Sequence, residues 1–299
     1  MDNFVSTPVS LRSLVRFQVA LLSGLVLFAS AVFGAMRLFA PGFIVTMGDL
    51  LDSVRAAEII VYIAVGFAAQ LVDGALGMAY GVTSTSLLLS AGIPPAVASA
   101  SVHAAEVVTT GVSGLSHWQF GNVQKELLRK LVLPGAIGAA VGAYVLTTFE
   151  GSMVRPYVAA YLLMMGFLIL RKGFRKRVSF RQPKRVGLLA LVGGFVDASG
   201  GGGWGPVVTS TLLGSGREPR TTIGTVNAAE FLVAVTASGV FSFFVGLSGW
   251  QVVLGLIVGG VLAAPLGAYL CQRIDAKICL VLVGFLIVGL SLRNLGLFF

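Results

Sequence analysis

Two glutamates lie deep within apolar sequence, at equivalent places in two copies of one segment. Glu106 follows Pro95 by eleven residues, and Glu230 follows Pro219 by the same interval, which places each about three turns into a helix. A charged group at the middle of a membrane is costly and therefore usually functional. Carboxyl groups that exchange a proton there suit a proton carrier. The alternative is a protonated glutamate that bonds across the interface between the copies.

The copies run from Asp73 to Glu106 and from Asp197 to Glu230 at a constant offset, without gaps. Of the 34 aligned positions, 13 are identical. An internal repeat that combines interrupted apolar segments with intramembrane carboxyl groups is typical of secondary transporters. We therefore assign four acidic residues to proton coupling: Glu106, Glu230, Asp73 and Asp197.

A histidine and its counterpart add polar groups to the same helices. His103 lies one turn before Glu106 on the same helix face, and Asn227 replaces it in the second copy. Each copy thus keeps a hydrogen-bonding group, which either handles substrate or protons or serves as a structural partner. Ser99 and Thr110 extend this face, but membrane helices commonly use Ser and Thr for packing.

The glycines near each aspartate suggest an anion site. Glycine frees the backbone to expose N–H groups at a helix start, and such starts attract anions. No Lys or Arg lies within the core of a predicted apolar segment, so these helix starts are the evident source of positive potential there. The predicted substrate-binding residues are Gly77, Tyr80, Thr85, Ser86, His103, Gly201, Gly202, Trp204, Thr209, Ser210 and Asn227. The alternative is close helix packing through small residues, as in the spacings Gly77–Gly81 and Gly201–Gly205. Asp73 and Asp197 have an alternative role as helix N-caps.

Composition places this chemistry in a membrane. The 299 residues are 56% hydrophobic and 11% charged, against roughly 25% charged in soluble domains. Eight of the 21 basic residues lie in the loop Arg171–Arg185, so the net charge of +9 indicates a cytoplasmic loop rather than nucleic-acid binding. The same loop suits binding to anionic lipid.

Cys271 and Cys279 are too sparse for a disulfide framework or a metal motif. No cofactor, metal or enzyme chemistry is expected.

Helices must position these residues, so the predicted fold class is an all-α polytopic membrane protein. The first apolar run, 17–40, is long enough to be a retained transmembrane helix. The later segments are predicted at 59–72, 76–91, 96–116, 131–148, 154–170, 186–197, 204–215, 221–245, 250–271 and 277–296. The short ones, split at Asp73-Gly74 and Gly200–Gly203, either span or form half-helices that meet near the midplane, and we favour half-helices.

Charge sets the predicted topology. Arg12 and Arg16 place the N-terminus in the cytoplasm, and the later basic clusters agree with this orientation. Each copy has five segments, an odd number, so the copies form an inverted-topology repeat and the C-terminus lies outside. The predicted parts are 1–57 (N-terminal helix and external linker), 58–170 (repeat 1), 171–185 (basic cytoplasmic loop) and 186–299 (repeat 2).

The sequences VDGALGMAYG and VDASGGGGWGP, each followed by a Pro-led helix ending in AAE, resemble the sulfite exporter TauE/SafE family. The resemblance covers about 59–296 and rests on the order of elements in both halves, whereas the extra N-terminal helix is less typical. It implies a bacterial inner-membrane protein that moves sulfite, sulfonates or other organosulfur anions. Such an oxyanion agrees with the glycine-rich helix starts.

We therefore expect a secondary transporter of a small sulfur oxyanion that works by alternating access. The rival readings are an anion channel, a cation transporter that uses the carboxyl groups as ligands, and, remotely, an intramembrane enzyme. The sequence leaves the substrate, the direction and the coupling ion open. It also leaves open the oligomeric state, including a homodimer.

Overall fold

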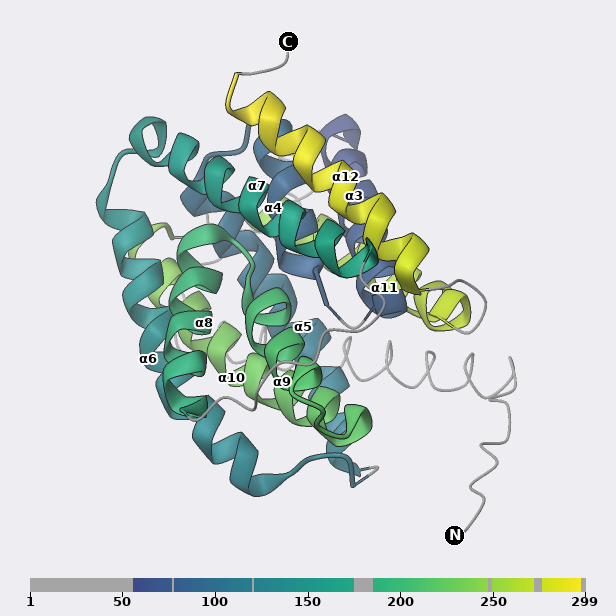
Figure 1. Cartoon of the computed structure of the whole chain (residues 1–299). Coiled ribbons are helices and arrows are strands. Elements are labelled where there is room, and N and C mark those ends of the chain that lie inside the picture. Colours follow the sequence, from purple (N-terminus) through teal and green to yellow (C-terminus); the bar gives the residue numbers. More distant parts are fainter. Residues whose placement is uncertain are drawn as a thin grey trace, which may run out of the picture. The chain divides into compact units, whose positions relative to one another are not determined.

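The described residues form helices and the turns that join them. The computed structural model describes residues 56–76, 78–119, 121–174, 185–246, 249–271 and 276–296. In chain order the elements are α3 (Ala56–Leu76), α4 (Tyr80–Ser90), α5 (Pro95–Gln119), α6 (Lys125–Thr148), α7 (Gly151–Phe174), α8 (Val186–Gly200), the π-helical turn η2 (Gly205–Thr209), α9 (Ser210–Gly214), α10 (Pro219–Phe244), α11 (Trp250–Cys271) and α12 (Ala276–Asn294) (Figure 1). The helix predicted at 17–40 and most of the basic loop lie outside the described residues.

The order of the segments predicted from 59 to 296 is confirmed, and several boundaries shift by three or more residues. The first short segment is longer than predicted, because α3 continues through Asp73 to Leu76. The helix predicted to start at 131 starts at Lys125 instead. Its polar first turns are helical because Lys130 pairs with Glu126 one turn earlier, at 2.6 Å.

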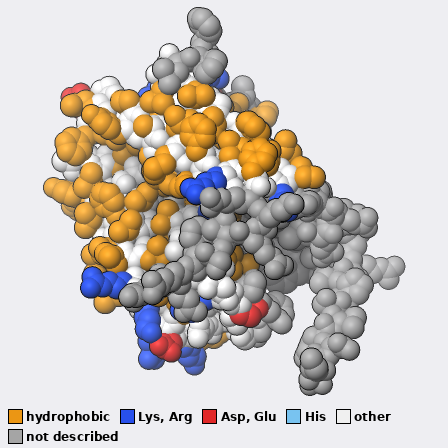
Figure 2. All heavy atoms as spheres, viewed as in Figure 1, with side chains coloured by type: hydrophobic (Ala, Val, Ile, Leu, Met, Phe, Trp, Pro, Cys, Tyr) orange, Lys and Arg blue, Asp and Glu red, His pale blue; other side chains and the backbone are white. Residues whose placement is uncertain are grey.

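The outer surface of these helices is suited to lipid. Among the described residues, α6, α7 and the stretch Thr221–Phe244 of α10 are long and apolar enough to cross a membrane. Large apolar side chains are exposed along α6, at Leu133, Ile137, Val141 and Tyr144. Figure 2 shows hydrophobic side chains over most of the described surface in view, with Lys and Arg most frequent toward its lower edge and a few near the middle and the top. The described part of the chain is therefore all-helical, and its surface is that of a membrane protein.

Glycines bring helices of the two halves into close contact. A Cβ on Gly138 would overlap the carbonyl group of Leu191, so α6 and α8 pack backbone to backbone. In the same way a Cβ on Gly66 would lie 2.6 Å from the Cα of Leu256, which joins α3 to α11. Small residues are the usual means of close helix packing in membranes. Two further pairs between the halves, α5 with α10 and α7 with α12, each join equivalent helices, and α6 also packs against α10.

Two turns interrupt the helices, one between α3 and α4 (the first break) and one between α8 and η2 (the second break). Their residues explain where the short helices begin and end. Gly201 ends α8 in the left-handed conformation (φ 73°), and Gly202 continues the break at φ 138°, which a side chain would disfavour. The first break instead has Ala79 in the left-handed region (φ 91°) directly before α4. Among the described non-glycine residues, only Ala79 has a positive φ.

Ala79→Gly is expected to stabilise the protein. The left-handed conformation costs an L-residue roughly 1–2 kcal/mol, and part of this gain is offset by the entropy of glycine, so the net effect should be about 0.5–1 kcal/mol. Thermal unfolding in detergent would measure it. The control is Ala69→Gly inside α3, where glycine should destabilise by about 1 kcal/mol. A lower melting temperature for Ala79→Gly would contradict the strain.

Candidate functional site

Asp197 closes the second break from the end of the preceding helix. It lies in the last turn of α8, and its Oδ1 accepts the backbone N–H groups of Gly203 (2.6 Å) and Trp204 (2.9 Å). These are the first free donors at the start of the next helical segment, which otherwise lack intrahelical partners. The carboxyl group of Asp197 therefore caps the helical segment that follows the second break.

Asp73 has the equivalent position in the first break, where it accepts a backbone hydrogen bond from Tyr80. The sequence predicts both aspartates at the breaks themselves, with capping of a helix start as one of two roles; their position is wrong, whereas the bonds to N–H groups of the next helix agree with capping. Each lies one turn earlier, inside the preceding helix, and caps the next helix from there. The positive-φ residues, rather than the aspartates, set the helix boundary.

The two breaks pack directly on each other. A Cβ on Gly81 would lie 2.7 Å from the Cα of Gly202, and one on Gly205 would lie 3.0 Å from the Cβ of Met78. The hydroxyl group of Thr85 donates to the carbonyl oxygen of Gly201. The alternative reading of these glycines as packing residues thus fits at Gly81 and Gly205, while Gly77 lies outside the described residues.

Gly81→Ala is expected to separate the breaks and destabilise the protein by roughly 1–3 kcal/mol, the usual cost of overpacking. The added methyl group would overlap the backbone of Gly202 and lie 3.0 Å from Oε1 of Glu106. The control is Gly239→Ala in α10, where a Cβ meets open space. Unfolding in detergent should show a loss for Gly81→Ala and no loss for Gly239→Ala. Equal stability of the two variants would refute the close approach.

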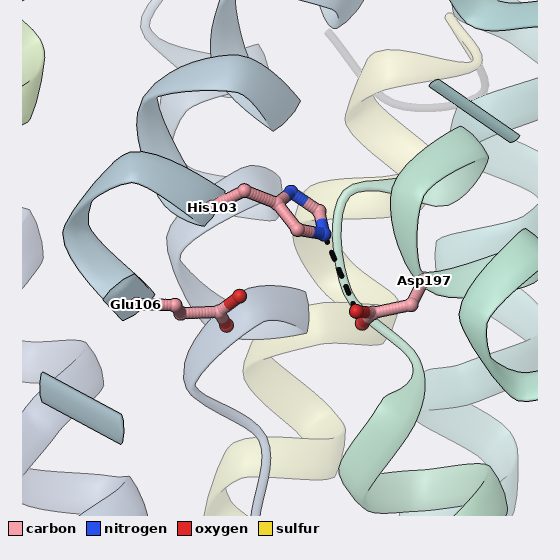
Figure 3. Close-up of side chains that lie close together, drawn as sticks. All are labelled: His103, Glu106 and Asp197. Carbon is pink, nitrogen blue, oxygen red and sulfur yellow. Dashed lines mark hydrogen bonds and ion pairs between the residues drawn. The ribbon is translucent and has the colours of Figure 1, made fainter. Parts of the chain in front are cut away.

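His103 and Asp197 form a buried hydrogen bond at this crossing, seen in Figure 3. Nε2 of His103 lies 3.2 Å from Oδ2 of Asp197, and Nδ1 lies 2.8 Å from the carbonyl oxygen of Ser99. A carbonyl oxygen only accepts, so Nδ1 must carry a hydrogen. The contact between Nε2 and Oδ2 then requires a second proton, on the imidazole ring or on the carboxyl group. The pair therefore shares a proton.

Glu106 points toward the same pair (Figure 3). It is 3% exposed, and its Oε2 has no hydrogen-bond partner among the described residues. One ligand atom from each of His103, Glu106 and Asp197 lies within 4.8 Å of the others, a spacing that a cation could bridge. Both oxygens of Asp197 already take part in hydrogen bonds within the protein, so we interpret the cluster as a group that shares protons.

A cavity of about 270 Å³ lies beside this cluster. Four carboxyl-bearing residues line it, namely Asp73, Glu106, Asp197 and Glu230. The starts of both short helical segments line it as well, through Tyr80 and Gly81 in one half and Gly203 and Gly205 in the other. A water molecule takes roughly 30 Å³ in the liquid, so the cavity has room for a small ion with several waters.

The predicted site residues are only partly brought together. Six of them line the cavity: Asp73, Tyr80, Glu106, Asp197, Asn227 and Glu230. Others hold the breaks or the core together: Thr85, Gly201 and Gly202 join the breaks, and Ser86 and Thr209 are buried. Trp204, which the alignment pairs with Tyr80, is fully buried and its indole N–H donates to the carbonyl oxygen of Val226 at 3.4 Å.

Lys172 is a residue that sequence reasoning assigned to the basic loop. The structure instead places it in the last turn of α7, where Nζ donates to the carbonyl oxygen of Pro206 (3.0 Å) and to the hydroxyl group of Ser210. A positive charge thus lies against the second short helix, contrary to the expectation that helix starts alone supply it. Nearby on α7, the hydroxyl group of Tyr161 donates to the carbonyl oxygen of Gly202 (2.6 Å).

A polar stripe on α5 was also missed in part. From Glu106 the cavity lining continues along one helix face through Thr109, Thr110, Ser113 and His117. The side chain of Asn227 donates to Ser113 across the α5–α10 contact at 3.0 Å. The spacing of three and four residues is visible in the sequence, but of these four residues the sequence prediction includes only Thr110.

Buried carboxyl groups around a polar cavity, inside a helical membrane protein, are features of a membrane transporter. The sequence model of one family, described as "Sulfite exporter TauE/SafE", matches residues 62–294, so the chain belongs to the sulfite exporter TauE/SafE family. The chain is also 46% identical over 249 residues to the "Probable membrane transporter protein YtnM" of Bacillus subtilis (strain 168), covering 80% of this chain and 83% of that protein. No solved structure matches the chain. The predicted family is therefore confirmed, and the protein is a membrane transporter.

Proposed function

We propose that this protein is a secondary transporter of a small sulfur oxyanion, sulfite or an organosulfonate, coupled to protons and working by alternating access. The observation that carries the proposal is the single cavity lined by four carboxyl groups and by the starts of two short helical segments. The family supplies the substrate class.

The charges around the cavity support proton coupling. Helix starts attract an anion, but ionised carboxylates at the same cavity would repel it. The anion is therefore accommodated only when the carboxyl groups carry protons. Substrate binding and proton uptake become one linked event, and Glu106, Glu230, Asp73 and Asp197 are the groups that take up the protons. Tyr80 and Asn227, which line the cavity, contact the anion.

Contacts between the halves support an inverted repeat. The pair α6–α8 has its counterpart in α3–α11 after the two repeats are exchanged, and α5–α10 and α7–α12 each pair equivalent helices. A pseudo-twofold axis in the membrane plane relates such pairs. The repeats then rock about the crossing of the two breaks, with α4 and α9 as half-helices near the midplane.

The basic residues orient the molecule. Lys125, Arg129 and Lys130 follow α5, and the basic loop follows α7, so these ends face the cytoplasm of the inner membrane. This orientation also places the N-terminus inside and the C-terminus outside. Arg171–Arg185 then meets the anionic lipid surface. The oligomeric state, including a homodimer, is not part of the proposal.

Flux into proteoliposomes tests the proposal. Sulfite uptake should saturate, should be inhibited by a sulfonate, and should accelerate when protons are supplied from the same side as sulfite. Trans-stimulation by internal sulfite should distinguish a carrier from a channel. Flux no greater than that of empty liposomes for sulfite and for a panel of sulfonates would refute the substrate class.

One observation favours a second candidate function, a cation transporter. The atoms of His103, Glu106 and Asp197 lie close enough to bind a cation together. Stabilisation of the purified protein by Na⁺ or by a divalent cation, without any effect of sulfite, would favour this candidate over the first.

A further inference from the structure

The two repeats line their halves of the pathway with different chemistry. On α5, Thr109, Thr110, Ser113 and His117 line the cavity and are partly exposed. The equivalent positions on α10, at the constant offset between the copies, are Val233, Ala234, Ala237 and Phe241. All four are apolar and at most 1% exposed. One half is open and polar, whereas the other is closed and dry.

One contact shows what closes the dry half. The rings of His103 and Phe241 pack with centroids 5.8 Å apart, and both side chains are buried. The residues at the equivalent positions of the other copy are Asn227, which aligns with His103, and His117, which aligns with Phe241. Those two residues line the open cavity instead of being buried against each other. Equivalent pairs are therefore in opposite states, closed in one half and open in the other.

We infer that these pairs are the two gates of the transporter. Phe241 closes over His103 at the α10–α11 side, and His117 closes over Asn227 at the α5–α6 side, where Asn227 already donates to Ser113. In this structure the first gate is closed and the second is open. The inference rests on the proposed alternating access and adds its moving contacts, since each gate opens as the other closes.

The difference in chemistry follows from what each gate must hold back. An apolar constriction excludes water when it closes, and with it a hydrogen-bonded path for protons. The α10–α11 gate is of this kind. The α5–α6 gate has hydroxyl and imidazole groups, which can donate hydrogen bonds to an anion as it enters or leaves the cavity.

Matched cysteine reporters test the gates. In a background with Cys271 and Cys279 replaced by alanine, Ser113→Cys and Ala237→Cys introduce small reporters at equivalent positions. A membrane-impermeant maleimide applied to vesicles from either side measures their accessibility. Ser113→Cys should react from the α5–α6 side at least about tenfold faster than Ala237→Cys reacts from the opposite side.

Phe241→Ala should then shift the balance between states. We expect faster labelling of Ala237→Cys and slower labelling of Ser113→Cys, each by roughly threefold or more. Phe241→Leu should act in the same direction with a smaller effect, and covers the case in which the alanine variant fails to fold. The matched control is Phe243→Ala on the same helix, where Phe243 is 83% exposed, and it should change neither rate.

The outcomes separate this inference from the proposed function. Phe241→Ala contradicts the gates if it raises both labelling rates or leaves the Ser113→Cys rate unchanged. This holds even if sulfite flux is measured in the same vesicles. Reciprocal labelling without sulfite flux would support the gates and reject the substrate.

Discussion

Asp197→Asn is expected to keep the fold and to abolish proton-driven transport. The amide oxygen can still accept the N–H groups of Gly203 and Trp204, so the second break stays closed. The amide cannot bind the proton that the carboxyl group shares with His103. Flux driven by a proton gradient should fall on the order of 100-fold, the scale on which proteins lose function when a proton-transfer group is removed.

Asp197→Ala separates the structural role from the chemical one. It orphans two buried backbone donors at roughly 1–3 kcal/mol each, so it should lower the melting temperature strongly. The asparagine variant should lose only about 1 kcal/mol per bond, because a neutral acceptor replaces a charged one. Melting curves in detergent and flux in proteoliposomes measure both effects. An asparagine variant that transports normally would remove Asp197 from proton coupling.

Glu106→Gln is expected to weaken the response of sulfite flux to the proton gradient, while the three other carboxyl groups at the cavity keep part of it. In the wild type, acidifying the side that supplies sulfite should raise flux, since protonated carboxyl groups accept the anion and ionised ones repel it. A glutamine has no charge at any pH, so flux should lose the part of its dependence on the gradient that Glu106 supplies. Binding itself should persist, because Gln preserves the shape of the cavity wall.

Flux at several imposed gradients measures this effect. Glu126→Gln is the control, since Glu126 is an exposed residue paired with Lys130 outside the cavity. It should keep the full response to the gradient. A Glu106→Gln variant with the same response as the wild type would assign proton coupling elsewhere, and Glu230→Gln would be the next variant to measure.

The sequence predicted the helix order and family because repetition and apolar length are visible in it. It misplaced the aspartates because Asp favours helix N-caps, whereas here backbone conformation at Gly201 and Ala79 ends one helix and begins the next. An aspartate in the last turn of a helix can cap the following helix only if the chain folds back on itself, and such a return is a tertiary property.

Two further features depended on tertiary structure. Lys172 stands next to Arg171, so its sequence position predicts the basic loop, but its side chain reaches the carbonyl oxygen of Pro206. The hydroxyl groups on α5 were ambiguous since Ser and Thr also pack helices in membranes. Only their exposure to one cavity identifies them as a lining. The roles assigned to individual site residues stay predictions.

The glycine contact between α3 and α11 has a consequence for synthesis of the chain. Gly66 and Leu256 are separated by about 190 residues. At roughly 5–20 residues per second, the ribosome needs on the order of 10–40 s to deliver the partner of α3. During that interval the Gly66 face of α3 must be shielded by lipid, by insertion machinery or by a temporary neighbour. The partners α6 and α8, by contrast, emerge within seconds of each other, which favours assembly of the α6–α8 pair before the α3–α11 pair.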